Sequence, residues 1–307
     1  MRVLLAVSGG IDSMYMLHRA PELFPGASFA VAHCNFGLRG EDSDGDEAFV
    51  KQVCADAGLE CFTARFDTVS YASQNGVSVE MAARRLRYGW FASLCSEKGF
   101  DALATAHNAN DNAETLILNL LRGTGTKGMR GIPNTPGHII RPLLDIPREE
   151  IEKWMKAEGH GWREDCTNSE SNYKRNKIRN QVFPVFAEIN PSFIRTLGED
   201  MERIRQTDDI ADDYFRDAAK TIATEQELGL EIKVPGLLAL KHWRYVLWRL
   251  VENCSFSAPT FEKLCRLLER YRAASPGTVT LSGKEFESPT HILKAKRKSL
   301  IIKERMQ

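Results

Sequence analysis

The chain lacks the cysteine spacing that marks structural metal sites and disulfide-stabilised folds. Its 307 residues contain seven cysteines, an odd number, and no Cys-x-x-Cys pair. A structural zinc site, a disulfide framework and a redox pair are therefore all unsupported. Scattered single cysteines are typical of proteins from a reducing compartment, which indicates the cytoplasm.

The chain also lacks long apolar runs and an excess of either charge. No run approaches the roughly 20 apolar residues of a membrane span, and no signal peptide precedes the first predicted strand, so we expect a cytoplasmic protein with no membrane partner. Its 41 Lys and Arg residues balance 41 Asp and Glu residues. Any polyanion must therefore be met by a local patch. Basic residues crowd 174–179 and 294–305, although such runs are often only solvated surface.

What the chain does have is a regular alternation of apolar runs and helical patterns. Short apolar runs indicate strands, and segments with apolar residues three or four apart, such as 79–95, indicate helices. This succession predicts an α/β fold with a doubly wound, mostly parallel sheet and helices on both faces. The predicted strands are Val3–Leu5, Phe29–Ala32, Leu59–Ala64, Asp101–Ala106 and Ile139–Ile140.

The pattern changes past residue 160. A polar, basic stretch over 165–180 gives way to a long amphipathic pattern, so we place a domain boundary near Val185, between domains 1–185 and 186–307. We expect the second domain to be smaller and mainly helical, with a short C-terminal hairpin element. Its predicted elements are helices Ser192–Ala223, Lys241–Asn253 and Thr260–Tyr271 and short strands Thr278–Leu281, His291–Lys294 and Leu300–Ile302.

A loop of small polar residues joins the first strand to the first helix and reads Ser-Gly-Gly-Ile-Asp-Ser over residues 8–13. Two adjacent glycines let the backbone turn sharply and bring N–H groups against an anion, and the helix behind adds its positive dipole end. Ser8 and Ser13 can add hydroxyl donors, while Asp12 can orient a backbone N–H or hold Mg²⁺. The loop is neither a Walker A loop nor a dinucleotide turn, because it lacks the Gly-Lys-Ser/Thr ending and the third spaced glycine. A Gly-Gly turn before an ordinary helix is the alternative.

Candidate side chains follow three of the predicted strands. Ser8, His33 and His107 each come directly after a strand. In parallel sheets ligands gather at the carboxyl ends of the strands, so these three turns should converge on one crevice. A purely structural turn would explain the glycines after His33, but not the arginine among them.

Charged residues on two predicted helices add further candidates. Glu80 and Arg84 lie on neighbouring turns of one helix, where surface ion pairing is the alternative. Asp111 and Glu114 lie three apart at the start of another, where carboxylates can hold Mg²⁺, receive an ammonium group, or merely complement the helix dipole. That helix leads through Arg122 into a glycine-rich basic loop suited to anions.

A basic segment completes the pattern. Arginines, asparagines and a tyrosine over 172–180 suit a phosphate backbone with a stacked base. Taken in order from Ser8 to Pro184, the motifs resemble the tRNA(Ile)-lysidine synthetase family of the PP-loop ATP-pyrophosphatase superfamily. The motifs are Ser-Gly-Gly-x-Asp-Ser, His-x-x-x-Gly-Leu-Arg-Gly, Ala-His-x-x-x-Asp-x-x-Glu-Thr, Leu-Leu-Arg-Gly-Thr-Gly and Arg-Asn-x-Ile-Arg.

The resemblance implies an adenine nucleotide alpha hydrolase-like fold and a ligase reaction. In that family, ATP adenylates the C2 oxygen of the wobble cytidine of an isoleucine tRNA with the anticodon CAU. The ε-amine of L-lysine then displaces AMP, which leaves lysidine in the tRNA. ATP and Mg²⁺ are the implied cofactors, the tRNA and L-lysine are the implied partners, and a homodimer is left open.

The resemblance also implies a role for each matching residue. Binding of the pyrophosphate and the nucleotide falls to Ser8, Gly9, Gly10, Asp12, Ser13, His33 and His107. Catalysis falls to Asp12, Asp111, Glu114, Arg84 and Arg122, with Asp12 and Asp111 also as ligands of Mg²⁺. Contacts with lysine or tRNA fall to Glu80, Arg141, Asn168, Arg175 and Arg179.

Other reactions can use the same loop. A tRNA thiolase would normally need a catalytic thiol pair, a ligase making an amide would leave the basic segment without a purpose, and a non-catalytic ATP-binding module would not need Asp12, Asp111 and Glu114. The chain departs from the family at Ala32, where many relatives carry Asp. One possible catalytic carboxylate is therefore absent, and Asp12 and Asp111 have to carry out more of the chemistry. Larger members have a further C-terminal domain that grips tRNA; if this chain is truncated, we expect intact ATP binding and weak tRNA affinity.

Overall fold

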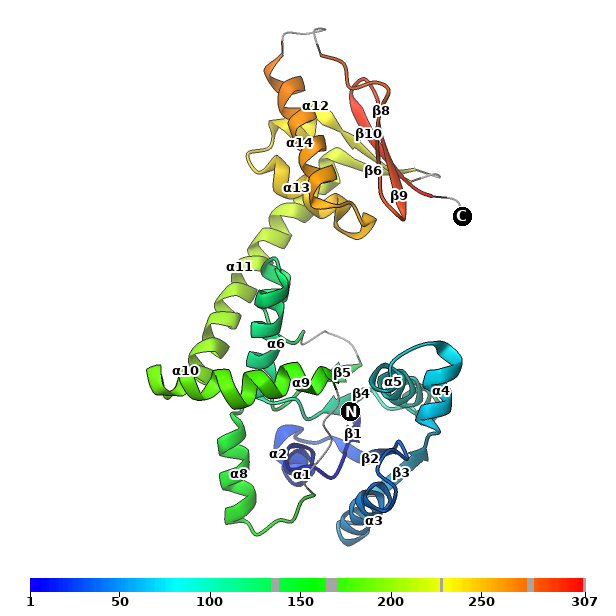
Figure 1. Cartoon of the computed structure of the whole chain (residues 1–307), viewed down its shortest axis with the longest axis vertical. Helices are drawn as coiled ribbons and strands as arrows, with labels where there is room; N and C mark the ends of the chain where they lie inside the picture. The colour runs from blue at the N-terminus through cyan, green and yellow to red at the C-terminus, as the bar shows by residue number, and fades with distance from the viewer. Residues whose placement is uncertain (134–137, 164–169, 227–228, 275–278, 306–307) are drawn as a thin grey trace. The chain divides into compact units, whose positions relative to one another are not determined.

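The computed structural model describes residues 1–133, 138–163, 170–226, 229–274 and 279–305 (Figure 1). The chain divides into two compact units, Met1–Arg205 and Gln206–Gln307. The division between the units falls inside one long helix, α11 (Phe193–Ile222). No helix in the described ranges combines the length and the apolar character needed to cross a membrane.

Five parallel strands form the sheet of the first unit in the order β3-β2-β1-β4-β5 (Figure 1). β1 is central and pairs with β2 on one side and with β4 on the other. This confirms the predicted α/β fold, and all five predicted strands are present. The strands are β1 (Arg2–Ala6), β2 (Ser28–Asn35), β3 (Glu60–Arg65), β4 (Ala102–Thr105) and β5 (Ile139–Ile140).

Alternate residues of the strands face two different cores. Val3 and Leu5 of β1 pack with α1, α3 and α8, whereas Leu4 packs with α5 on the opposite face. All three side chains are fully buried, and each contributes about 1.5–3 kcal/mol by leaving water. Because helices cover both faces, the sheet is doubly wound, and the strand order reverses between β1 and β4, where α/β sheets bind ligands.

The helices of this unit follow the strands in the order that the sequence predicts. α6 packs outside the sheet against η1 and α10 around Ala113, Ile178 and Phe183. This packing brings the segment after residue 170 to the start of α6. The helices are α1 (Ile11–His18), α2 (Ala20–Leu23), α3 (Glu41–Asp56), α4 (Thr68–Asn75), α5 (Val79–Lys98), α6 (Ala109–Arg122), α7 (Thr126–Met129), α8 (Arg148–Ala157), α9 (Glu170–Lys177), the π-helix η1 (Ile178–Val182) and α10 (Phe183–Ile189).

The second unit contains more β-structure than predicted. Its antiparallel strands lie in the order β6-β7-β10-β9-β8, so the expected C-terminal hairpin is one part of a five-stranded sheet, while helices still make up more of the described residues of this unit than strands do. The run from Thr278 to Leu281 is not a strand where it is described, and Thr278 lies outside the described residues. The elements are β6 (Ala223–Gln226), β7 (Gly229–Lys233), α12 (Val234–Ala239), α13 (Trp243–Val251), η2 (Glu252–Cys254), α14 (Ala258–Ala273), β8 (Lys284–Glu287), β9 (His291–Ala295) and β10 (Ser299–Glu304).

Candidate functional site

The loop after β1 folds around a single hydroxyl oxygen. The backbone N–H groups of Ser8 and Gly9 both donate to Ser13 Oγ over 3.2 Å, and this hydroxyl donates to the carbonyl oxygen of Gly10 over 2.8 Å. Gly9 has a φ of +94°, a conformation that glycine adopts without strain. Two N–H groups of the loop therefore already point at one oxygen position.

The first turn of α1 lies directly behind this loop. Its N-cap is Gly10, which has no side chain to satisfy the first N–H groups of the helix. The positive end of the helix dipole consequently adds to the N–H groups of the loop. Such a combination binds phosphate and other anions.

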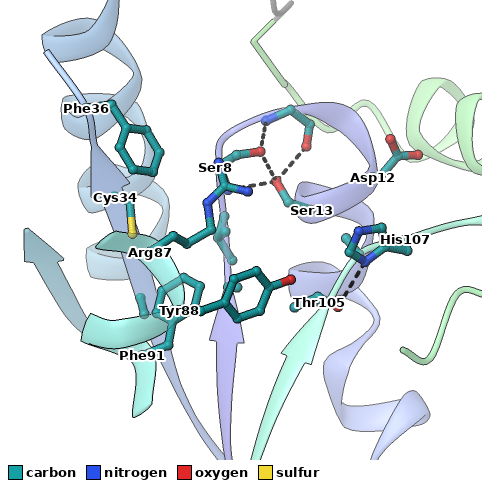
Figure 2. Close-up of a pocket in the computed structure, with 15 residues that line it drawn as sticks. Ser8, Asp12, Ser13, Cys34, Phe36, Arg87, Tyr88, Phe91, Thr105 and His107 are labelled. Atoms are coloured by element: carbon teal, nitrogen blue, oxygen red, sulfur yellow. Dashed lines mark hydrogen bonds between the residues drawn. The ribbon is translucent and has the colours of Figure 1, made fainter. Parts of the chain in front are cut away.

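A pocket of about 300 Å³ opens beside the loop (Figure 2). Figure 2 shows the loop with Ser8 and Ser13 above the pocket, the side chains of α5 on one side, and Thr105 and His107 on the other. Three groups of side chains line it besides the loop: Ala32, Cys34 and Phe36 at the end of β2, Arg87, Tyr88 and Phe91 on α5, and Thr105, Ala106 and His107 at the end of β4.

Aromatic rings braced by arginines form one wall of the pocket. The Arg87 guanidinium lies 5.0 Å from the centroid of the Phe36 ring, and that of Arg84 lies 5.0 Å from the centroid of the Tyr88 ring. Phe36 also stacks on Phe66 with centroids 5.7 Å apart. Rings held in this way suit a planar heterocyclic base, which can stack on them while the cations meet its phosphate groups.

Asn108 connects two carboxylates at the edge of the pocket. Its Nδ2 donates to Asp12 Oδ1 over 2.9 Å, and its backbone N–H donates to Asp111 Oδ2 over 3.1 Å. Asp12 Oδ2 pairs with Arg148 Nη1 at 2.5 Å. Burial raises the pKa of Asp12, while Arg148 and Asn108 act in the opposite direction. The side chains of α1, α6 and α8 thus meet next to the anion loop.

Glu114 lies one turn further along α6 and is fully buried. Its Oε1 accepts from Arg179 Nε over 2.8 Å, whereas its Oε2 has no hydrogen-bond partner. Burial raises the pKa of Glu114 despite the charge of Arg179. Arg179 also approaches Asp111 Oδ1 at 3.5 Å. A buried oxygen without a partner, close to the acidic side chain of Asp111, is suited to a cation that arrives with the substrate.

His107 lies among charged side chains. Thr105 Oγ1 and His107 Nδ1 are 3.1 Å apart. Burial lowers the pKa of His107, Asp111 acts to raise it, and Arg141, Arg175 and Arg84 act to lower it. Asp111 and the three arginines come from separate parts of the sequence. All four are close enough to His107 to influence the pKa of its imidazole.

Other predicted site residues lie elsewhere. His33 is buried on the face of β2 opposite the pocket, where its Nδ1 lies 2.9 Å from the carbonyl oxygen of Val7, because its neighbours Ala32 and Cys34 point into the pocket. Arg122 is exposed at the end of α6, about 16 Å along the helix from Asp111. Glu80 is exposed in the first turn of α5. Asn168 lies outside the described residues.

Several residues of the site carry no signal in the sequence. Arg148 stands at the start of α8, where its backbone N–H donates to Asn110 Oδ1 over 3.0 Å and its side chain holds Asp12. The pattern around Phe36 and Tyr88 indicates only ordinary core positions. The spacing of Arg87 and Phe91 on the same helix as Arg84 is the one pattern that could have placed that helix beside the pocket.

Oxygen donors next to the loop fit a hard divalent cation. Among the described residues, no group of three or more His, Cys, Asp or Glu side chains forms a ready-made metal cage. Mg²⁺ usually keeps several water ligands and takes one or two carboxylates together with substrate phosphates. Asp12 and Asp111, beside an anion-binding loop, therefore fit Mg²⁺ bound together with a nucleotide.

Comparison with known proteins agrees with this geometry. The family model of the PP-loop domain matches residues 1–186, and that of the TilS substrate binding domain matches residues 225–305. In the solved U34-tRNA thiolase NcsA from Methanococcus maripaludis, which carries a [4Fe-4S] cluster, 72% of the chain aligns with 66% of this one, with a TM-score of 0.56 and 20% identity. This likeness supports the fold alone.

Curated relatives are closer in sequence. The tRNA(Ile)-lysidine synthase of Parabacteroides distasonis is 35% identical over 300 residues, which are 98% of this chain and 65% of the relative. That of Chlorobaculum tepidum is 46% identical over 210 residues, which are 66% of this chain and 61% of the relative. The chain thus spans less than two thirds of the length of either relative. With its loop, sheet and motif order, the chain belongs to the PP-loop domain family.

Proposed function

We propose that the chain is an ATP-dependent ligase that joins L-lysine to C2 of the wobble cytidine of an isoleucine tRNA with the anticodon CAU, with release of AMP and pyrophosphate. The observation that carries the proposal is the position of an anion-binding loop directly beside Asp12, Asp111 and the buried, unpaired Oε2 of Glu114. The printed names of the relatives and the match to a TilS substrate binding domain support the choice of tRNA.

In the first step, the C2 oxygen of the cytidine attacks the α-phosphate of ATP. The bond between the α-phosphate and the pyrophosphate breaks, and the N–H groups of Ser8 and Gly9 with the N-terminus of α1 stabilise the charge on the departing pyrophosphate. The aromatic wall at Phe36 and Tyr88 holds a base in the pocket. Asp12 and Asp111 would hold Mg²⁺, which supplies further neutralisation of phosphate charge.

In the second step, the ε-amine of lysine attacks C2 of the cytidine. The new bond to nitrogen forms as the bond from C2 to the adenylated oxygen breaks, so AMP leaves with that oxygen. Lysine arrives as an ammonium ion and has to lose a proton before it can attack. Asp111 and Glu114 are the carboxylates that receive the ammonium group and take up this proton, with Arg179 orienting Glu114.

Basic side chains around His107 meet the tRNA. Arg84, Arg141 and Arg175 carry the positive charge that a phosphate backbone needs, in a chain without net charge. Burial lowers the pKa of Arg141, whose buried Nε has no hydrogen-bond partner and so has a donor left for the substrate. Glu80 and Asn168 stay predicted contacts of lysine or tRNA, and Arg122 stays a predicted catalytic residue.

The direct test is transfer of labelled lysine to RNA. We expect label from radioactive lysine to enter an isoleucine tRNA transcript with the anticodon CAU, with one AMP formed per lysine, and not to enter a transcript whose wobble cytidine is uridine. In single turnover, Asp12→Ala and Asp111→Ala should each abolish AMP formation. AMP formation without lysine incorporation would instead indicate another nucleophile, as in a thiolase, and no AMP at all would indicate an ATP-binding module.

Two further statements depend on this function. Because its substrate is tRNA, we place the chain in the cytoplasm, which localisation of a tagged protein in cells can test. A homodimer stays a prediction, which light scattering of the purified chain can check.

A further inference from the structure

Asp46 on α3 is a buried carboxylate outside the nucleotide pocket, and it holds two arginines from different segments. Its side chain is 8% exposed, its Oδ2 pairs with Arg39 at 2.7 Å, and its Oδ1 pairs with Arg163 Nε at 2.8 Å. A buried carboxylate is strongly unfavourable unless it is paired in this way. The two ion pairs join α3 to the turn at Arg39 and to Arg163, which follows α8 in the sequence.

Arg163 also contacts the anion-binding loop through its backbone. Its N–H donates to the carbonyl oxygen of Gly9 over 2.9 Å. Because a peptide unit is planar and trans, fixing this carbonyl also fixes the N–H of Gly10 at the other end of the same peptide. That N–H points back into the loop, 3.3 Å from Ser8 Oγ.

Glycine on α3 provides the room for the Arg163 side chain. A Cβ added at Gly45 would lie 3.0 Å from Arg163 Nη2, closer than most real contacts of a Cβ. Glycine is unfavourable inside a helix, so its presence next to Asp46 is explained by the guanidinium that passes over it. The ion pair with Asp46 thus holds the side chain of Arg163, and the absence of a Cβ at Gly45 leaves room for it.

We propose that Arg163, anchored by Asp46, is a positioning residue of the loop and fixes the Gly9–Gly10 peptide so that the loop N–H groups face the β- and γ-phosphates of ATP. Neither Arg163 nor Asp46 is among the residues that line the pocket, so both act through the loop. This inference rests on the proposed function, because it takes ATP as the ligand of the loop.

The test compares two nucleotides that differ in the phosphates held by the loop. Arg163→Ala of the full chain keeps the backbone N–H that donates to Gly9 but removes the charge-assisted hydrogen bond to Asp46 that holds this backbone in place. We therefore expect the dissociation constant of ATP to rise on the order of tenfold. The dissociation constant of AMP, which has no β- or γ-phosphate, should stay unchanged. Arg163→Lys should recover part of the loss, because its ammonium group can still pair with Asp46. Calorimetric titration with each nucleotide measures these values.

Arg65→Ala is the matched control. Arg65 pairs with Asp44 and Glu47 on the same helix, so its loss removes similar ion pairs without touching the loop. Unchanged ATP affinity in Arg163→Ala, an equal loss for ATP and AMP, or an equal loss in Arg65→Ala would each overturn the positioning role. If Arg163→Ala does not fold, Asp46→Asn is the second variant: we expect it to raise the dissociation constant of ATP and to leave that of AMP unchanged. If the wild-type chain binds no ATP, the proposed function itself is wrong. That result is separate from the test of the positioning role, because it is seen without any variant.

Discussion

Gly9 combines two demands on one residue, since its N–H donates to Ser13 Oγ within the loop and its φ of +94° lies where side chains are strained. A Cβ at Gly9 would make only ordinary contacts, the nearest at 3.5 Å from Val50 Cγ2, so the strain would come from the backbone. We expect Gly9→Ala to lower the free energy of unfolding by about 1–2 kcal/mol and to weaken ATP binding. Urea denaturation and ATP titration measure the two effects.

Gly10→Ala is the control for that prediction, because Gly10 has an extended φ of −71° and an added Cβ would lie 3.5 Å from Ser8 Oγ. Its loss of stability should be clearly smaller. Equal losses at both positions would show that crowding, not backbone strain, decides the choice of glycine.

Glu114 predicts a pH dependence of stability. Its pKa is raised in the folded chain by burial, so the folded state holds the proton more tightly than the unfolded state does. The resulting stabilisation is complete below the unfolded pKa of about 4.3 and is lost as the pH rises through the raised folded pKa. Glu114→Gln removes this loss, so the stability of the variant relative to wild type should increase from pH 4 to pH 8. Urea denaturation across this range checks it, and a difference independent of pH would contradict the assignment.

Side-chain direction explains how much of the site could be predicted. The sequence places Ser8 and His107 at the ends of neighbouring strands, and both line the pocket. The sequence predicts that His33 also follows a strand, but His33 lies inside β2, where side chains alternate between the two faces, so Cys34 takes the place expected for His33. Arg148 could not be predicted, because only the packing of α8 on α1 brings it to Asp12.

At the scale of the element, α5 forms a complete wall of the pocket and begins and ends with defined caps. Ser78 Oγ accepts from the backbone N–H of Met81 over 3.2 Å, and Gly99 ends the helix with a φ of +67°. Gly89 lies inside the helix with open space around its Cα. We expect Gly89→Ala to raise the free energy of unfolding by about 0.5–1 kcal/mol.

Gly99→Ala, at the end of the same helix, should have the opposite effect on stability from Gly89→Ala. It places a side chain in the left-handed region and should destabilise the chain by about 1 kcal/mol. Denaturant unfolding of the two variants should therefore shift in opposite directions. A stabilising Gly99→Ala would contradict the assigned role of the cap.

The strands of the parallel sheet could be predicted from the sequence more completely than those of the antiparallel sheet. The strands of the parallel sheet contain short apolar stretches between helical patterns, and the sequence predicts all five of them. β6 (Ala223–Gln226) follows α11 directly and contains Glu and Gln, which also suit a helix, so no local pattern separates the two. It becomes a strand because it pairs with β7, whose other edge pairs with the distant β10.

At the scale of the whole molecule, each unit has its own hydrophobic core. The core of the second unit centres on fully buried residues such as Leu247 and Leu268, and that of the first unit includes the fully buried Leu143. We expect Leu247→Ala to cost the second unit about 2–5 kcal/mol. ATP affinity, which depends on the first unit, should not change.

Scanning calorimetry with and without ATP checks this independence. Leu247→Ala should lower the melting transition that ATP does not raise, whereas Leu143→Ala should lower the transition that ATP stabilises. A single transition that both variants shift equally would instead show that the units unfold together.

The hydroxyl of Ser13 has one more consequence for the loop. Its oxygen accepts the N–H groups of Ser8 and Gly9, so the loop is folded around an oxygen atom of its own chain. Binding is then an exchange of one acceptor for another, in which the hydroxyl gives up its place to a phosphate oxygen and turns to donate to it. Little conformational entropy is lost in such an exchange, and we expect association to be fast and free of a slow loop-ordering phase.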